Sequence, residues 1–150
     1  MPLTIVLVDD DPDFRLIVHN ILGSASDTMT IVGEAADGEE GLAVVLRERP
    51  DIVITDLVMP RLNGIGLTRR IRQELPETKI ILISFYTEDA YRLMASDSGA
   101  DAFVSKQVID SSLLPAIRDV IARRLSGGSG PLLPSAGAIR ERRGAQARST

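Results

Sequence analysis

The chain is 150 residues long and carries 17 basic and 21 acidic residues, for a formal net charge of −4. It contains no cysteine, which excludes disulfide bonds and thiolate metal sites. No apolar stretch approaches the ~18 residues of a membrane span, and the N-terminus lacks the basic region of a signal peptide. We therefore expect a cytoplasmic protein that is long enough for one domain with a hydrophobic core.

Charge and composition change near residue 125. Residues 1–125 hold 13 basic and 20 acidic residues, whereas residues 126–150 hold four arginines and one glutamate. The net negative charge of the first part argues against binding of this domain to nucleic acid backbones. The second part is rich in Gly, Ser, Pro and Arg, a composition typical of flexible segments. We expect a folded domain over residues 1–125 and a flexible tail or linker over residues 126–150.

The chain begins with an apolar run that predicts a buried strand over Leu3–Val8. Three aspartates follow this run. The third, Asp11, suits a helix N-cap and Pro12 suits the first helical position, so we expect a helix from there to about Gly23. A second, weaker strand is expected over Met29–Ala35.

Asp37 and Glu40 have the spacing of a capping box, which predicts a second helix that ends before Pro50. The next run, Asp51–Asp56, is almost wholly apolar and rich in β-branched residues. It predicts a strand that is buried on both faces of a parallel sheet. Packing does not explain a carboxylate at the end of such a strand, so Asp56 is a candidate reactive or metal-binding residue.

A third helix is expected between Asn63 and Pro76, and a fourth strand over Lys79–Ser84 ends in a polar residue. Thr87 is expected to cap a fourth helix, which ends at Gly99.

A fifth strand over Ala100–Ser105 leads directly to Lys106. Asp110 or Ser111 is then expected to cap a fifth helix with a buried apolar side. Outside these patterns, His19 is expected to be an isolated surface residue.

Five strand–helix pairs in strict alternation predict an α/β fold. The expected architecture is flavodoxin-like, a doubly wound five-stranded parallel sheet of order 2-1-3-4-5 with five helices. The carboxyl ends of all five strands then share one edge of the sheet. The polar residues that follow or end the strands should meet at that edge: Asp9, Asp10, Asp11, Asp56, Ser84 and Lys106.

These side chains suit one type of chemistry. Carboxylates that lie close together without His or Cys favour Mg²⁺, which prefers hard oxygen ligands. A hydroxyl from Ser84 and an ammonium from Lys106 beside the same site could hold a phosphoryl group. The set therefore predicts phosphoryl transfer to Asp56, with Mg²⁺ and Lys106 neutralising the charge on the phosphoryl oxygens.

The same residues, in the same order, carry a family resemblance. Together with Met59-Pro60, Asn63-Gly64 and the segment from Gly99 to Lys106, they resemble a response-regulator receiver domain over about residues 3–125. The absence of Pro after Lys106, where Gln107 stands, resembles most closely the subgroup that precedes helix-turn-helix output domains. No such output domain is present in the 150 residues. Without that Pro, a trans peptide bond is expected at Lys106–Gln107.

The resemblance implies a role for each site residue. Asp56 would accept phosphate from a phosphohistidine of a sensor histidine kinase. Asp10, Asp56 and the backbone carbonyl of Val58 would bind Mg²⁺, and Asp9 would act mainly through water. Ser84 and Lys106 would bind the phosphoryl group.

The resemblance also implies a switch and a set of partners. Ser84 and Phe103 would be the switch residues, which reshape the surface of the fourth helix, fifth strand and fifth helix. The expected partners are the kinase, a downstream output domain or protein in transcription regulation, and a second copy of the chain on phosphorylation. No membrane partner is expected, and no enzymatic activity beyond self-phosphorylation from a donor and self-dephosphorylation.

Two side chains depart from the family pattern, and two more stand at positions that tune it. Phe85 follows Ser84 where a small residue is usual, which would restrict access of bulky phosphodonors. Phe103 replaces the commoner Tyr. By resemblance, Val58 and Tyr86 occupy the positions that set the lifetime of the acyl phosphate, and neither suits the orientation of an attacking water.

Two other functions fit part of the pattern. The chain could be a degenerate receiver, a binding module that never takes phosphate, although the complete set of site residues argues against this. The motif of Asp9 and Asp11 also resembles that of haloacid-dehalogenase-type phosphatases, with Asp9 as nucleophile and Asp11 as acid/base. Pro12-Asp13 does not fit that family, and this reading leaves Asp56 without a role.

Overall fold

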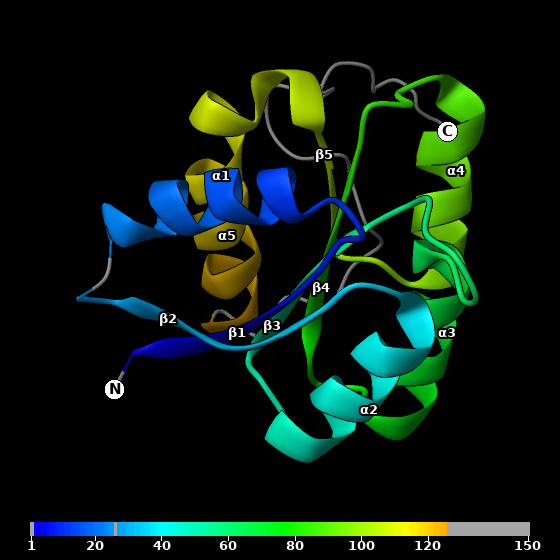
Figure 1. The fold of residues 1–150 in the computed structure, drawn as a ribbon, viewed down its shortest axis with the longest axis horizontal. Helices are drawn as coiled ribbons and strands as arrows, with labels where there is room; N and C mark the ends of the chain where they lie inside the picture. The colour runs from blue at the N-terminus through cyan, green and yellow to red at the C-terminus, as the bar shows by residue number, and fades with distance from the viewer. Residues whose placement is uncertain (1, 26, 126–150) are drawn as a thin grey trace.

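The computed structural model describes residues 2–25 and 27–125 of the chain, and the expected tail over residues 126–150 lies outside the described residues. Strands and helices alternate along the chain (Figure 1). The strands are β1 (Leu3–Val8), β2 (Met29–Ala35), β3 (Ile52–Asp56), β4 (Lys79–Ser84) and β5 (Ala102–Ser105). The helices are α1 (Pro12–Gly23), α2 (Gly38–Glu48), α3 (Gly64–Glu74), α4 (Asp89–Ser98) and α5 (Ile109–Leu125), with a 3-10 turn η1 (Lys106–Val108) before α5.

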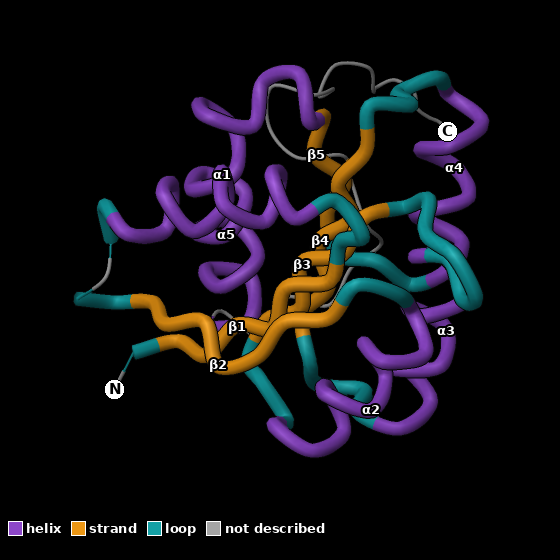
Figure 2. Tube along the Cα trace, in the orientation of Figure 1, coloured by secondary structure: helices purple, strands orange, loops and turns teal. Residues whose placement is uncertain are grey.

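The five strands form one parallel sheet in the order β2-β1-β3-β4-β5, which confirms the order expected from the sequence. The carboxyl ends of the strands lie at one edge of this sheet, where loops connect them to the helices that follow (Figure 2). The part of the chain that the structure describes contains no cis peptide bond, as expected for Lys106–Gln107.

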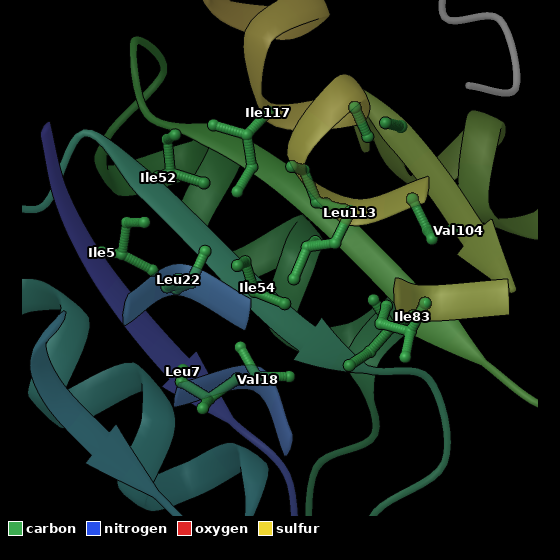
Figure 3. Close-up of a cluster of buried hydrophobic side chains, with 14 of the residues drawn as sticks. Ile5, Leu7, Val18, Leu22, Ile52, Ile54, Ile83, Val104, Leu113 and Ile117 are labelled. Carbon is green, nitrogen blue, oxygen red and sulfur yellow. The ribbon is translucent and has the colours of Figure 1, made fainter. Parts of the chain in front are cut away.

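Helices cover both faces of the sheet, so the domain has two hydrophobic clusters. Helices α1 and α5 cover one face, and α2, α3 and α4 cover the other (Figure 1). The side chains of β3 and β4 alternate between the faces, because successive residues of a strand point in opposite directions. Figure 3 shows the first cluster, in which Ile54 of β3 packs with Val18 of α1 and Leu113 of α5. Burial on both faces explains the continuous apolar runs of these strands.

Strand β2 contains one extra residue, which accounts for its weaker pattern. Ile5 pairs with Ile31, but the next residue, Val6, pairs with Gly33, so Val32 is bulged. A Cβ on Gly33 would lie 2.6 Å from a methyl group of Val44 in α2. Gly33 therefore interrupts the apolar pattern because helix α2 packs directly against the strand at that position.

Two of the expected helix caps are confirmed. The carboxylate of Asp11 accepts hydrogen bonds from the backbone N–H groups of Asp13 and Phe14 at the start of α1. The carboxylate of Asp37 accepts a 2.8 Å bond from the N–H of Glu40 at the start of α2. Satisfying these free N–H groups fixes where each helix begins.

Two other expected caps are wrong. Glu88, not Thr87, precedes α4 at the N-cap position, and it makes no capping bond with its side chain. The backbone carbonyl of Thr87 instead accepts a 3.0 Å bond from Nε of Arg92.

Helix α5 begins at Ile109, before the expected caps Asp110 and Ser111. The reason is that the chain turns into η1 immediately after β5. The hydroxyl of Ser105 accepts a hydrogen bond from the N–H of Gln107 and so caps the start of η1. Lys106 is therefore held in a helical turn at the end of β5.

Candidate functional site

The structure brings five of the expected polar residues to the carboxyl edge of the sheet. Asp9 and Asp10 follow β1, Asp56 is the last residue of β3, Ser84 is the last residue of β4, and Lys106 follows β5. The parallel registers keep these strand ends level with one another.

Three of the side chains form an acidic cluster. Carboxylate oxygens of Asp9, Asp10 and Asp56 all lie within 4.8 Å of one another. Asp9 and Asp56 are buried, whereas Asp10 is exposed. Like charges at this separation repel one another, so the cluster requires a cation to compensate it.

Lys106 supplies one such cation. Its ammonium nitrogen lies 2.8 Å from Oδ2 of Asp9 and 3.2 Å from Oδ2 of Asp56, and only 5% of the side chain is exposed. The other oxygen of Asp9 accepts a 2.9 Å bond from the N–H of Asp11. One ammonium shared by two buried carboxylates leaves the cluster with net negative charge once Asp10 is counted.

The environment of Asp56 disfavours its charged form. Burial raises the pKa of Asp56 from 3.8 to about 6; the Lys106 charge opposes this shift, and the Asp9 charge adds to it. The Asp56 carboxylate also accepts a long, 3.4 Å hydrogen bond from the N–H of Val58. A carboxylate that is costly to ionise gains most when a cation binds beside it.

Ser84 is fully buried at the end of β4 and faces the loop that follows. Its oxygen accepts a 2.8 Å bond from the N–H of Tyr86. Because β4 and β5 pair at Ser84 and Ser105, Ser84 lies one residue away in register from Lys106. The O–H of Ser84 remains a donor for a group that binds at the edge.

The expected switch residue, Phe103, lies inside the domain. It is 1% exposed and belongs to the cluster under α2, α3 and α4. The guanidinium carbon of Arg92 in α4 lies 5.0 Å from the centroid of its ring. Burial lowers the pKa of Arg92 from its ordinary value. Arg92 thus connects Phe103 with Thr87, whose carbonyl it also contacts.

Sequence patterns did not reveal the contacts of three residues of helix α1. Arg15 of α1 donates to the backbone carbonyl of Asp9 and contacts the carboxylate of Glu34 in β2. His19, expected to be isolated, contacts the same carboxylate of Glu34. Phe14 packs in the hydrophobic cluster under α1, and its ring also faces Lys106. The one available signal was helical spacing, which places Phe14 and Arg15 in the first turn of α1 beside the aspartates.

The family that this geometry suggests is confirmed by comparison with known proteins. A sequence model of the response regulator receiver domain matches residues 5–118. The chain belongs to the family of response-regulator receiver domains, and it is therefore a signalling domain of a two-component system.

Relatives and solved structures agree with this assignment. The transcriptional activator protein ExaE of Pseudomonas putida is 40% identical over 118 residues, which are 79% of this chain and 55% of ExaE. The response regulator protein VraR of Staphylococcus aureus is 30% identical over 118 residues, 79% of this chain and 56% of VraR. The chain thus spans about half the length of these relatives.

Two solved structures share the fold. The signal receiver domain of the putative response regulator NarL from Mycobacterium tuberculosis has a TM-score of 0.72 and 31% identity, over 83% of this chain and 97% of that one. A LuxR-family response regulator from Aurantimonas has a TM-score of 0.76 and 33% identity, over 81% of this chain and 86% of that one. Their descriptions, a receiver domain and a two-component response regulator, agree with the family assignment. Among the described residues, no helix is both long and apolar enough to cross a bilayer.

The raised pKa of Asp56 predicts a stability gain in the Asp56→Asn variant that depends on pH. The folded protein holds the Asp56 proton more tightly than the unfolded chain, so ionisation costs stability as pH rises from about 4 to above about 6. The neutral amide avoids this cost. We expect the free energy of unfolding to rise by about 1–3 kcal/mol at about pH 7.5 and to change little at about pH 4. Urea unfolding of both proteins in metal-free buffer measures this difference in the free energy of unfolding.

Asp10→Asn provides a matched control, because it removes an exposed carboxylate of the same cluster. We expect it to change the free energy of unfolding by less than about 0.5 kcal/mol. An equal gain for Asp56→Asn at both pH values would contradict the explanation, because packing rather than ionisation would then be its cause.

Proposed function

We propose that Asp56 is the phosphoacceptor of this receiver and that it takes a phosphoryl group from the phosphohistidine of a sensor histidine kinase. A carboxylate oxygen of Asp56 forms the new bond to phosphorus while the bond from phosphorus to the histidine nitrogen breaks. The nitrogen leaves with the bonding electron pair. The observation that carries the proposal is the buried Asp56 carboxylate, which lies beside a single ammonium and two further carboxylates.

The residues present fit a magnesium ion. Three carboxylates gather within 4.8 Å, and the single ammonium among them does not neutralise the cluster. Oxygen ligands of this kind suit Mg²⁺. Asp10, Asp56 and the backbone carbonyl of Val58 would hold the ion, and Asp9 would act through water. When bound, the ion would neutralise negative charge on the phosphoryl oxygens.

Lys106 and Ser84 would hold the phosphoryl group itself. The ammonium of Lys106 already lies 3.2 Å from the Asp56 carboxylate, so it is in place to pair with a phosphoryl oxygen there. The Ser84 oxygen accepts from the N–H of Tyr86, which leaves its own O–H free to donate. Charge compensation from these groups supplies the stabilisation that phosphoryl transfer requires.

The contacts around Phe103 provide a route from the phosphoryl group to the surface. Movement of Ser84 toward the phosphoryl group would pull on the N–H of Tyr86 and on the loop that contains Thr87. Arg92 contacts the Thr87 carbonyl and lies over the ring of Phe103, so it would respond to that movement. The surface of α4, β5 and α5 would then change, and an output domain or protein, or a second copy of the chain, would recognise it.

The alternative functions are less favoured by the geometry. As a haloacid-dehalogenase-type nucleophile, Asp9 would need an accessible carboxylate, but it is fully buried and bonded to Lys106. Asp11 caps α1 with its carboxylate, which occupies the group that would act as acid/base. A degenerate receiver would lack one of the site residues, and all are present here. We propose a cytoplasmic signalling domain whose only chemistry is its own phosphorylation and dephosphorylation.

A small phosphodonor with Mg²⁺ should add one phosphoryl group to the chain. We expect intact-mass spectrometry to show this adduct in the parent and not in Asp56→Asn, because the acceptor oxygen is lost. Asp11→Asn serves as the control, because it changes an acid of the same loop that has only a capping role. An unchanged adduct on Asp56→Asn, or one mapped to Asp9, would reject the proposal.

Phosphorylated Asp56 should hydrolyse slowly for a receiver. Val58 is half exposed beside the site and has no side-chain hydrogen-bonding group to orient a water. The ring of Tyr86 contacts Tyr91 of α4, with centroids 5.5 Å apart, so Val58 and the neighbouring Phe85 would give most of the shielding. Loss of water positioning can slow hydrolysis by a factor of about ten or more.

The double variant Val58→Asn, Tyr86→Glu tests this explanation. We expect its phosphorylated form to decay about tenfold faster than the parent in Mg²⁺ buffer, because polar side chains can orient an attacking water. Decay is followed by the loss of the phosphoryl adduct with time. If the variant decays no faster, another feature sets the lifetime.

A further inference from the structure

Two phenylalanine rings lie beside the ammonium of Lys106, in addition to its two carboxylate partners. The ammonium nitrogen lies 4.3 Å from the centroid of the Phe14 ring and 5.5 Å from that of Phe85. The two rings meet edge to face, with centroids 6.0 Å apart and planes at 78°. Both distances are within the ~6 Å over which a ring face attracts a cation.

The two rings come from different elements and differ in burial. Phe14 lies in the first turn of α1 and is buried in the cluster that α1 and α5 share. Phe85 directly follows Ser84 and is 54% exposed. A ring so exposed contributes little to the core, so packing alone does not explain a phenylalanine at this position. Its defined neighbours are Phe14 and the ammonium of Lys106.

The ammonium is thus enclosed by groups that each favour a cation. The carboxylates of Asp9 and Asp56 accept from it, and the electron-rich ring faces lie nearby. Water has little access, because the Lys106 side chain is 5% exposed. Exclusion of water strengthens charge–charge and charge–ring interactions.

We infer that Phe14 and Phe85 are positioning residues for phosphoryl transfer, because they hold the ammonium of Lys106 beside Asp56. This inference rests on the proposed function of Asp56 and Lys106. The rings restrict the long, flexible Lys106 side chain to positions from which its charge reaches a phosphoryl oxygen on Asp56. A bulky aromatic residue after Ser84 therefore has a role in the reaction besides narrowing the access of donors.

Substitutions at Phe85 test this role, because the exposed position tolerates change. Phe85→Leu keeps an apolar side chain but removes the ring face, whereas Phe85→Tyr keeps the face. A series of fluorinated phenylalanines at position 85 keeps the shape and progressively weakens the negative charge of the face. The full chain is phosphorylated with phosphoramidate and Mg²⁺ over a range of donor concentrations, which separates the maximal rate constant from the donor concentration at half-maximal rate.

We expect the maximal rate constant to fall about two- to five-fold in Phe85→Leu and to fall stepwise along the fluorinated series. Phe85→Tyr should retain the parental value. Phe14→Leu should have a larger effect, because the Phe14 ring is nearer to the ammonium. Circular dichroism first checks that this variant is folded. Leu16→Ala is the matched control, because Leu16 is also an exposed apolar residue, 60% exposed, and should leave the rate unchanged.

A second measurement does not depend on phosphate transfer. Protons near the face of a ring are shifted upfield in NMR spectra, so the Cε protons of Lys106 should lose part of such a shift in Phe85→Leu. Parental maximal rate constants in Phe85→Leu and the fluorinated series would overturn the inference. A faster variant, or a change confined to the donor concentration at half-maximal rate, would also overturn it, because Phe85 would then only obstruct the donor.

Failure of the proposed function would look different. In that case the parent would take no phosphoryl group, or Asp56→Asn would still take one. The NMR measurement alone would then test whether the two rings lie beside Lys106. An unshifted Lys106 signal in the parent would show that they do not.

Discussion

The contact between the Lys106 ammonium and the carboxylates of Asp9 and Asp56 is the interaction on which the site depends. Two buried carboxylates at the carboxyl edge of the sheet cannot both ionise at low cost without a cation between them. The same contact joins the ends of β1, β3 and β5, three strands that are distant in sequence. The poor compensation of this edge in the resting protein favours the further cation and the phosphoryl group that we propose it binds.

The surrounding contacts position the groups that lie around the Lys106 ammonium and Asp56. The turn η1 places Lys106 directly after β5, and the N-cap of α1 places Phe14 against the ammonium. Next to them, Ser84 bonds to the loop that leads to α4, and Arg92 of α4 lies over Phe103. A charge added at Asp56 would thus act on two groups at once: the ammonium that holds the site together and the hydroxyl that tethers the α4 loop. This is how a local chemical change can bias a distant surface.

Much of the fold could be predicted because its signals are local. The parallel sheet is implied by the apolar β-branched runs, by the caps at Asp11 and Asp37, and by the strict strand–helix alternation. A parallel sheet in turn implies a shared edge for the polar residues at its strand ends, which are Asp9, Asp56, Ser84 and Lys106. The predicted cap of α4 was wrong because the helix begins one residue later than a Thr87 cap requires, with Glu88 at the N-cap position. The carbonyl of Thr87 bonds to Arg92, a contact within the folded loop that propensity does not reveal. The contacts of Lys106 with two phenylalanines were missed for a related reason. An apolar residue in a helix, such as Phe14, predicts burial but not the group that it meets, and Phe85 lies in a loop where no periodic pattern indicates its neighbours.

The most direct test of the central claim is the stability of a Lys106→Met variant, measured by urea unfolding with and without Mg²⁺. Without Mg²⁺ we expect a loss of about 3 kcal/mol or more relative to the parent, because removal of one partner leaves buried carboxylates uncompensated. Mg²⁺ should then restore more stability to the variant than it adds to the parent, because the ion replaces a missing cation. A variant as stable as the parent without Mg²⁺, and no more responsive to the ion, would contradict the account.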